Sequence, residues 1–343
     1  MLTTILSGGL IGLIFGFILQ RTRFCLTGGF RDMYIARNNT LFYAFLIAIT
    51  VESIGVLSLI KLGIIGNPYE EFSVLGAIVG SYLFGIGIVL AGGCATGTWY
   101  RAGEGLLGSW VALFFYMTSA AAMKSGFLVP LNQLIAKRWV INDDLAGQLG
   151  IPVWYLLVFL VAITSFIVIR ELRKPRRQIA TLPSKYKGVR HYLFEKTYHK
   201  YFAGFLIGLV ALIAWPASQL TGRVGGLGIT TPSAHLISYI ITGDSKQLGW
   251  GVFLVLGIFL GSFLAAKGSR EFRWRLPDLS TIGKSTLGGI FMGIGASWAG
   301  GCTIGNGLTA TAIFSSKGWI ALPVTILGVW TASYIILVKP NKN

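Results

Sequence analysis

Two of the three cysteines in this chain lie in copies of one glycine-rich motif. The motif reads LAGGCATG at Leu90–Gly97 and WAGGCTIG at Trp298–Gly305, so each copy places a thiol directly after a Gly-Gly pair. A thiol is a weak hydrogen-bonding group and a ligand for soft metal ions, and glycine permits backbone conformations that other residues avoid. The repetition therefore indicates two related sites whose chemistry depends on Cys94 and Cys302.

The composition places these motifs in a membrane. Of the 343 residues, 54% are hydrophobic and 12% are charged, whereas about a quarter of the residues in soluble domains are charged. The first apolar run lacks the features of a signal peptide, so we expect it to remain in the mature protein. Nine runs approach the ~20 residues that cross a bilayer as a helix; they begin near Ile5, Thr40, Val74, Leu106, Ile151, Phe202, Gly249, Lys284 and Trp319. The sequence predicts an all-α polytopic membrane protein with about nine transmembrane helices, together with re-entrant or broken half-helices.

The net charge of +17 is distributed between the spans. Basic residues gather in Arg170–Lys200, Lys267–Arg275 and Lys339–Asn343, and the positive-inside rule places such segments in the cytoplasm. We therefore expect a multi-pass protein of the bacterial inner membrane with its N-terminus outside and its C-terminus in the cytoplasm. A role of Arg170–Lys200 at the membrane surface or on RNA is an alternative, but a solvated loop is favoured and no nucleic-acid partner is predicted.

With this threading, the two cysteine motifs follow spans of opposite direction. The basic segment also divides the chain, so that the motifs occupy matching places in its two halves. Such an arrangement is typical of inverted-topology repeats, whose broken helices meet near the bilayer midplane. The predicted organisation is a first membrane repeat at 1–169, a cytoplasmic linker at 170–200 and a second membrane repeat at 201–343, all within one integral membrane unit.

Each Gly-Gly-Cys sequence is interpreted as a helix break that faces a path. In a bilayer, an unwound backbone is tolerated where it is buried in protein or lines a polar cavity, and the free N–H groups of a half-helix favour an anion. Close helix packing through small residues is the alternative for the glycines. Besides the two cysteines, the candidate helix-break and path residues are Gly92, Gly93, Thr96, Gly300, Gly301 and Thr303.

The third cysteine lies in a basic stretch, QRTRFCLTGGFRD. Arg23 and its neighbouring arginines would attract an anion toward Cys25. The alternative is that Cys25 is a small buried apolar residue. The matching segment of the second half, TGRVGGLGITTPSAH, retains Arg223 but has no cysteine, so the two halves differ here.

Other site classes have little support in the sequence. There is no Cys-x-x-Cys and only three histidines, so no metal cage and no cofactor are predicted, although a copper(I) path stays open. An odd number of cysteines forms no disulfide framework. No paired carboxylates or nucleophile-base pair indicates an enzyme. Among the ionisable residues within spans, Glu52 is a candidate to line the path, unless it only pairs with a basic neighbour.

The motifs AGGCATG and AGGCTIG, together with RFCLTGGFRD and GITTPSAH, resemble the YeeE/YedE family of bacterial membrane proteins over essentially the whole chain. The resemblance implies thiosulfate uptake and an hourglass-shaped, pseudo-symmetric helical fold. It also implies that three thiols, matching Cys25, Cys94 and Cys302 here, hand the ion inward, and that a small cytosolic sulfurtransferase-like protein is a partner. Some relatives are associated with selenium, so a selenium species remains an alternative substrate.

Neutral thiols suit such a substrate, because thiosulfate is a dianion with a terminal sulfur and a thiolate would repel it. We expect S–H···S hydrogen bonds from protonated thiols in single file, too far apart for a disulfide. Cys94 and Cys302 are expected at a narrow centre, and Cys25 at one mouth. The alternative function is a membrane sulfur-transfer or redox component that forms a persulfide on one cysteine.

Overall fold

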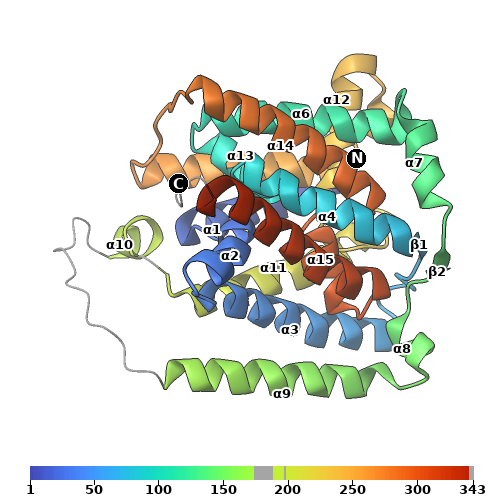
Figure 1. Ribbon diagram of the computed structural model, residues 1–343. Coiled ribbons are helices and arrows are strands. Elements are labelled where there is room, and N and C mark those ends of the chain that lie inside the picture. Colours follow the sequence, from blue (N-terminus) through green and yellow to red (C-terminus); the bar gives the residue numbers. More distant parts are fainter. Residues whose placement is uncertain (174–187, 197, 340–343) are drawn as a thin grey trace.

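The chain folds into a bundle of helices that lie side by side (Figure 1). The structure is a computed structural model that describes residues 1–173, 188–196 and 198–339. Most of the predicted linker, 174–187, therefore lies outside the described residues, as do residues 340–343. The described part confirms the all-α prediction. Its long helices are α1 (Leu2–Thr22), α3 (Thr40–Lys61), α4 (Val74–Leu90), α6 (Leu107–Ser125), α9 (Val153–Leu172), α11 (Lys200–Gln219), α13 (Trp250–Gly268), α14 (Leu279–Trp298) and α15 (Ser316–Ser333).

The number of helices able to cross a membrane is smaller than predicted. Seven helical segments among the described residues are long and apolar enough, or eight if α6 and α7 (Val129–Ala136), bent by 72°, form one span. Helix α14 is not apolar enough to be counted among them, because its first half, LSTIGKSTLGG, is rich in polar residues and glycine. It packs against α4 and α6, although residues 279–284 at its start are exposed. The predicted nine crossings therefore become seven or eight by this measure.

Short elements mark the two ends of the bundle. The antiparallel strands β1 (Glu71–Ser73) and β2 (Val140–Asn142) define the strand end, and α10 (Val189–Phe194) defines the linker end. In Figure 1 these ends lie to the right and to the left. The remaining short elements are α2 (Leu26–Ile35), α5 (Ala95–Gly103), α8 (Leu145–Leu149), α12 (Thr230–Thr242), η1 (Ser245–Gln247), η2 (Gly305–Ala310) and η3 (Tyr334–Val338).

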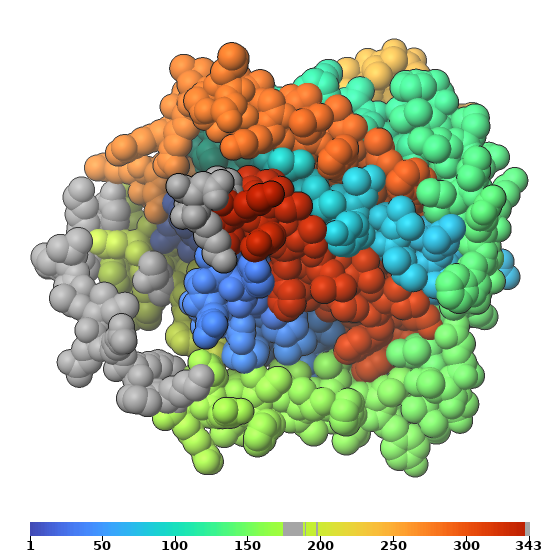
Figure 2. Space-filling view, viewed as in Figure 1, coloured from blue at the N-terminus to red at the C-terminus, as the bar shows by residue number. Residues whose placement is uncertain are grey.

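Helix α9 lies at the edge of the bundle, against α3 (Figure 1), and forms the lower margin of the face seen in Figure 2. Its large apolar side chains are mostly exposed, including Tyr155 (70%) and Phe159 (66%). An apolar surface of this kind is costly in water but suits contact with hydrocarbon. This outer face supports the interpretation of the chain as a multi-pass membrane protein.

The helix pairings of one half recur in the other. Helix α1 packs on α13 and α11 packs on α3, while α6 packs on α14 and α15 packs on α4. The shift in sequence that aligns Cys94 with Cys302 also aligns α3 with α13, α4 with α14, and α6 with α15. Helices α4 and α14, which correspond to each other in the two halves, also pack on each other. Helices α7, α8 and α9 have no counterpart in the second half of the described chain.

Glycine allows these helices to approach closely. A Cβ built on Gly12 of α1 would collide with the backbone carbonyl of Leu254 on α13, and one on Gly204 of α11 would collide with that of Ala44 on α3. Backbones that approach this closely gain dispersion contacts that larger side chains would prevent. The helix pairs are therefore specified partly by where glycines face.

We expect Gly12→Ala to destabilise the folded protein by roughly 1–3 kcal/mol, because the added methyl forces α1 away from α13. Gly9→Ala on the same helix is the matched control, since a Cβ there meets nothing within 4 Å. The measurement is thermal unfolding of both variants in detergent. Equal stability of the two variants would contradict the packing described for Gly12.

Candidate functional site

Both cysteine motifs lie where a long helix ends. Helix α4 ends at Leu90 and α14 ends at Trp298, and the next glycines, Gly92 and Gly300, have positive φ angles of 70° and 69°. This left-handed conformation strains residues with a Cβ, so glycine is required at both positions. After each turn, the chain enters a short helical segment, α5 or η2.

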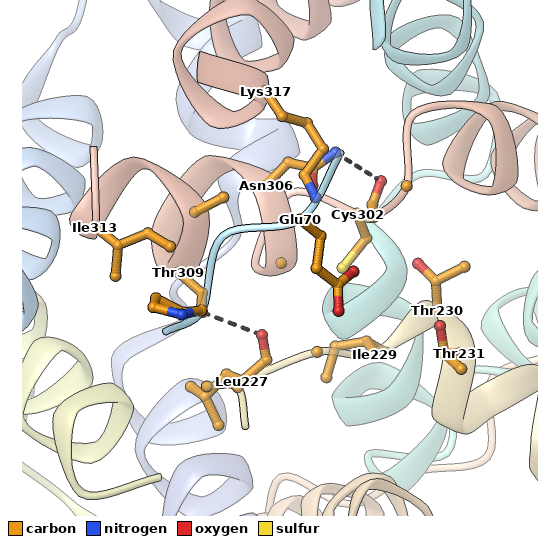
Figure 3. Close-up of a pocket in the computed structure, with 18 of the residues that line it drawn as sticks. Glu70, Leu227, Ile229, Thr230, Thr231, Cys302, Asn306, Thr309, Ile313 and Lys317 are labelled. Carbon is orange, nitrogen blue, oxygen red and sulfur yellow. Dashed lines mark hydrogen bonds between the residues drawn. The ribbon is translucent and has the colours of Figure 1, made fainter. Parts of the chain in front are cut away.

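Cys302 lines a polar cavity at the strand end of the bundle, with a volume of about 380 Å³. Its sulfur points into this cavity (Figure 3). Two cationic side chains, Arg223 and Lys317, also line it. The polar and acidic residues around the cavity include Glu70, Asp143, Thr230, Thr231, Asn306 and Thr309. The cavity therefore offers donors and positive charge beside a thiol, as an anion requires.

Asp143 holds the start of α15 against this cavity. Its carboxylate accepts hydrogen bonds from the Ser315 hydroxyl (2.6 Å) and the Lys317 backbone N–H (2.8 Å), and it lies 3.9 Å from the Lys317 ammonium. Burial raises the pKa of the Asp143 carboxyl. Because the ion pair with Asp143 is long, the Lys317 ammonium remains able to face an anion in the cavity.

Cys25 and Cys94 lie together on the linker side of this cavity. Cys25 precedes α2 and Cys94 precedes α5, and their thiols lie close enough to interact. Both sulfurs also lie close to Gly97, at 3.6 Å and 3.4 Å from a Cβ built there. The expectation that all three thiols are well separated is therefore wrong for this pair. The backbone N–H of Gly97 donates to the Cys94 sulfur (3.3 Å).

Two buried aromatic side chains, Tyr116 and Trp99, lie in this part of the bundle. Tyr116 is fully buried, lies near both Cys94 and Cys302, and donates a hydrogen bond to the Thr230 hydroxyl (2.9 Å). The indole N–H of Trp99 donates to the Ser233 hydroxyl (2.9 Å). Cys94 and Cys302 were expected together at one narrow centre. In the structure, Cys302 lines the strand-end cavity, and the enclosed Cys94 lies near Cys302 and beside Cys25.

A second cavity, of about 340 Å³, lies on the other side of Cys25. Arg23, Arg101 and Lys200 line it together with Cys25. Arg23 is partly neutralised, because it pairs with Glu271 (3.0 Å) and Glu104 (3.6 Å).

Arg101 was missed by sequence reasoning. Its guanidinium bonds the Gly92 carbonyl, which ties α5 to the turn before Cys94. Its position seven residues after Cys94, two turns along one face of a helix, was the available signal.

Glu52 is fully buried but lines neither cavity. One of its carboxyl oxygens accepts a hydrogen bond from the Trp215 indole N–H (2.9 Å), and the carboxyl also contacts the Thr309 hydroxyl. Trp215 and Thr309 themselves line the strand-end cavity. Glu52 therefore lies behind the cavity wall, and no basic neighbour pairs with it among the ion pairs of the described residues.

The other candidates lie close to the cysteines. Gly300 and Gly301 line the strand-end cavity, whereas Gly92 and Gly93 form the turn that Arg101 contacts. Thr96 and Thr303 are buried, at 3% and 4% exposed. No group of histidine, cysteine and carboxylate side chains in the described residues could hold a metal ion.

Comparison with known proteins identifies the family of this chain. The model of the family described as Sulphur transport matches residues 21–331. The chain belongs to this family. Within the Sulphur transport family, it is 54% identical over 343 residues to "Thiosulfate transporter TsuA" of Escherichia coli, with 100% of this chain and 97% of the relative covered. It is 33% identical over 344 residues to the protein of that name from Spirochaeta thermophila, with 96% of this chain and 98% of the relative covered. "Probable transporter YedE" of Escherichia coli shares 42% identity over 101 residues, which are 29% of this chain and 25% of that protein.

Proposed function

We propose that this protein takes up thiosulfate across the bacterial inner membrane, without converting it chemically. The observation that carries the proposal is the order of the thiols between two polar cavities: Cys302 lines the first, Cys25 lines the second, and Cys94 lies between them. The two full-length relatives named as thiosulfate transporters support the choice of ion.

The direction of the path follows from charge. Lys267 lies in the last turn of α13, and Arg270, Arg273 and Arg275 lie between α13 and α14. The end of α13 lies beside α10, since a Cβ built on Gly268 would meet Phe194. The positive-inside rule then makes the linker end cytoplasmic and the strand end external. The N-terminus is outside and the C-terminus inside, and 1–169 and 201–343 form inverted repeats joined by the cytoplasmic segment 170–200. The recurring helix pairings support this division.

Charged groups and neutral thiols act at different places along the path. Lys317 and Arg223 attract the dianion into the external cavity, and Arg101 and Lys200 receive it on the cytoplasmic side. Between them, neutral thiols meet the terminal sulfur without placing a fixed charge in the narrow part. Contacts that are weak and successive allow the ion to bind and still leave. Because Cys94 and Cys25 touch, transfer between them is the shortest step.

The cavity that Cys25 lines is where a cytosolic acceptor would receive the ion. A small sulfurtransferase-like partner, implied by the family resemblance, would dock at the linker end. Such docking would let the product leave the path directly into an enzyme.

The direct test is uptake of radiolabelled thiosulfate into lipid vesicles that contain the purified protein. We expect accumulation well above that of protein-free vesicles, with saturation as thiosulfate is raised. Selenite and hydrosulfide serve as competitors, and a selenium species that competes better than unlabelled thiosulfate would identify a different substrate. Absence of uptake would contradict the proposal.

The same samples decide the alternative of covalent sulfur transfer. A persulfide adds one sulfur atom to a cysteine, so intact-protein mass spectrometry after exposure to thiosulfate reports it directly. We expect no such adduct during uptake. An adduct that forms and disappears at the rate of uptake would favour the sulfur-transfer alternative.

A further inference from the structure

Three buried threonine hydroxyls in the structure have no hydrogen-bond partner. They belong to Thr27, Thr96 and Thr303, whose residues are 5%, 3% and 4% exposed. The described residues hold two more enclosed hydroxyls without a partner, those of Ser53 and Ser333, and neither follows a cysteine. Each of the three threonines lies one or two positions after a cysteine, so that each of the three thiols has such a neighbour.

Other buried threonines in the same segments satisfy their hydroxyls locally. Thr22 donates to the Ile18 carbonyl, Thr98 to that of Ala95 and Thr311 to that of Gly307. Leaving a buried hydroxyl unpaired is costly, and such groups are rare in folded proteins. Three of them, one beside each cysteine, therefore indicate a shared requirement for a donor that is kept free.

The placement of the hydroxyls is also repeated. Cys25 and Cys94 both occupy the position that precedes a helix, and Thr27 and Thr96 are both the second residue of that helix. Thr303 follows Cys302 directly and shares with it the lining of a small cavity beside η2. The recurrence in three segments with different surroundings argues against a local packing cause.

We infer that Thr27, Thr96 and Thr303 donate hydrogen bonds to the sulfonate oxygens of the passing ion, so that each thiol and its neighbouring hydroxyl form one binding step. This inference rests on the proposed function and deepens it. Thiosulfate has two chemically different ends, a polarizable sulfur and three hard oxygens. A thiol is a weak, soft partner, whereas a hydroxyl is a strong donor to a charged oxygen. A paired thiol and hydroxyl thus match both ends.

The experiment replaces each hydroxyl by a methyl group of similar shape. We expect Thr27→Val, Thr96→Val and Thr303→Val each to raise the half-saturating thiosulfate concentration, or to lower the maximal uptake rate, by about tenfold, as loss of a hydrogen bond to a charged group predicts. The matched controls are Thr22→Val, Thr98→Val and Thr311→Val, whose hydroxyls bond carbonyls in the same segments. Their uptake is expected to stay near that of the unmodified protein.

Two further readouts separate this role from a structural one. Because no bond is lost, the melting temperature of the three test variants should equal or exceed that of the unmodified protein. Thr96→Ser, which keeps the hydroxyl, should retain most of the uptake. If the unmodified protein takes up thiosulfate and the test variants match their controls, the inference is wrong although the proposed function stands. Reduced uptake that follows reduced stability would also overturn it.

Discussion

Replacing Cys94 by alanine is expected to lower thiosulfate uptake per unit of folded protein by about tenfold or more. The reason is that Cys94 is enclosed, at 3% exposed, and lies between the cysteines that line the two cavities. Loss of one hydrogen bond to an ion is worth about 1.5–3 kcal/mol, and about 1.4 kcal/mol corresponds to a factor of ten. Cys94→Ser should restore uptake only partly, because a hydroxyl is shorter and harder than a thiol.

The corresponding changes at the two cavities provide the comparison. Cys25→Ala and Cys302→Ala should also reduce uptake, but less, because cationic side chains and solvent in each cavity still support the ion. Removal of one sulfur from a core costs about 1–2 kcal/mol, so all three variants should fold. Uptake is measured in vesicles and normalised to folded protein. Normal uptake in all three variants would mean that the cysteines serve packing alone.

The second large effect is expected from oxidation. The Cys25 and Cys94 thiols lie close together and neither is in a disulfide. Treatment with an azodicarboxamide oxidant should link them: each thiol loses one hydrogen to the azo group, which becomes a hydrazine, as the S–S bond forms. Both sulfurs would then lose their donor hydrogens, and uptake should fall by about tenfold or more. Dithiothreitol should restore it by reducing the bond.

Peptide mapping makes this test specific. The linked peptides should contain Cys25 and Cys94, whose sulfurs both lie beside Gly97. Cys302, which lines the strand-end cavity, should remain free for alkylation. A disulfide that includes Cys302, or full uptake by protein in which Cys25 and Cys94 are linked, would contradict the arrangement described for the three thiols.

The sequence by itself determined those features that depend on neighbouring residues. Apolar runs of helical length located the nine long helices that the described residues form, since a segment in lipid must satisfy its backbone hydrogen bonds internally. Gly-Gly before Cys94 and Cys302 marked the helix ends, because Gly92 and Gly300 require positive φ angles. The fixed interval between the motifs also indicated which helices of the two halves correspond.

Only the tertiary structure decided which side chains meet. Cys25 and Cys94 are separated by 69 positions along the chain, and their contact depends on how α2 and α5 enter the bundle. From the sequence, Glu52 is a candidate path residue. In the structure it accepts a hydrogen bond from Trp215 of α11 and lies behind the wall of the strand-end cavity. The unpaired state of Thr96 beside the satisfied Thr98 is equally hidden in the sequence. Helix propensity and hydropathy act over a few residues, whereas contacts between helices depend on the facing surfaces of segments distant in sequence, which no local pattern encodes.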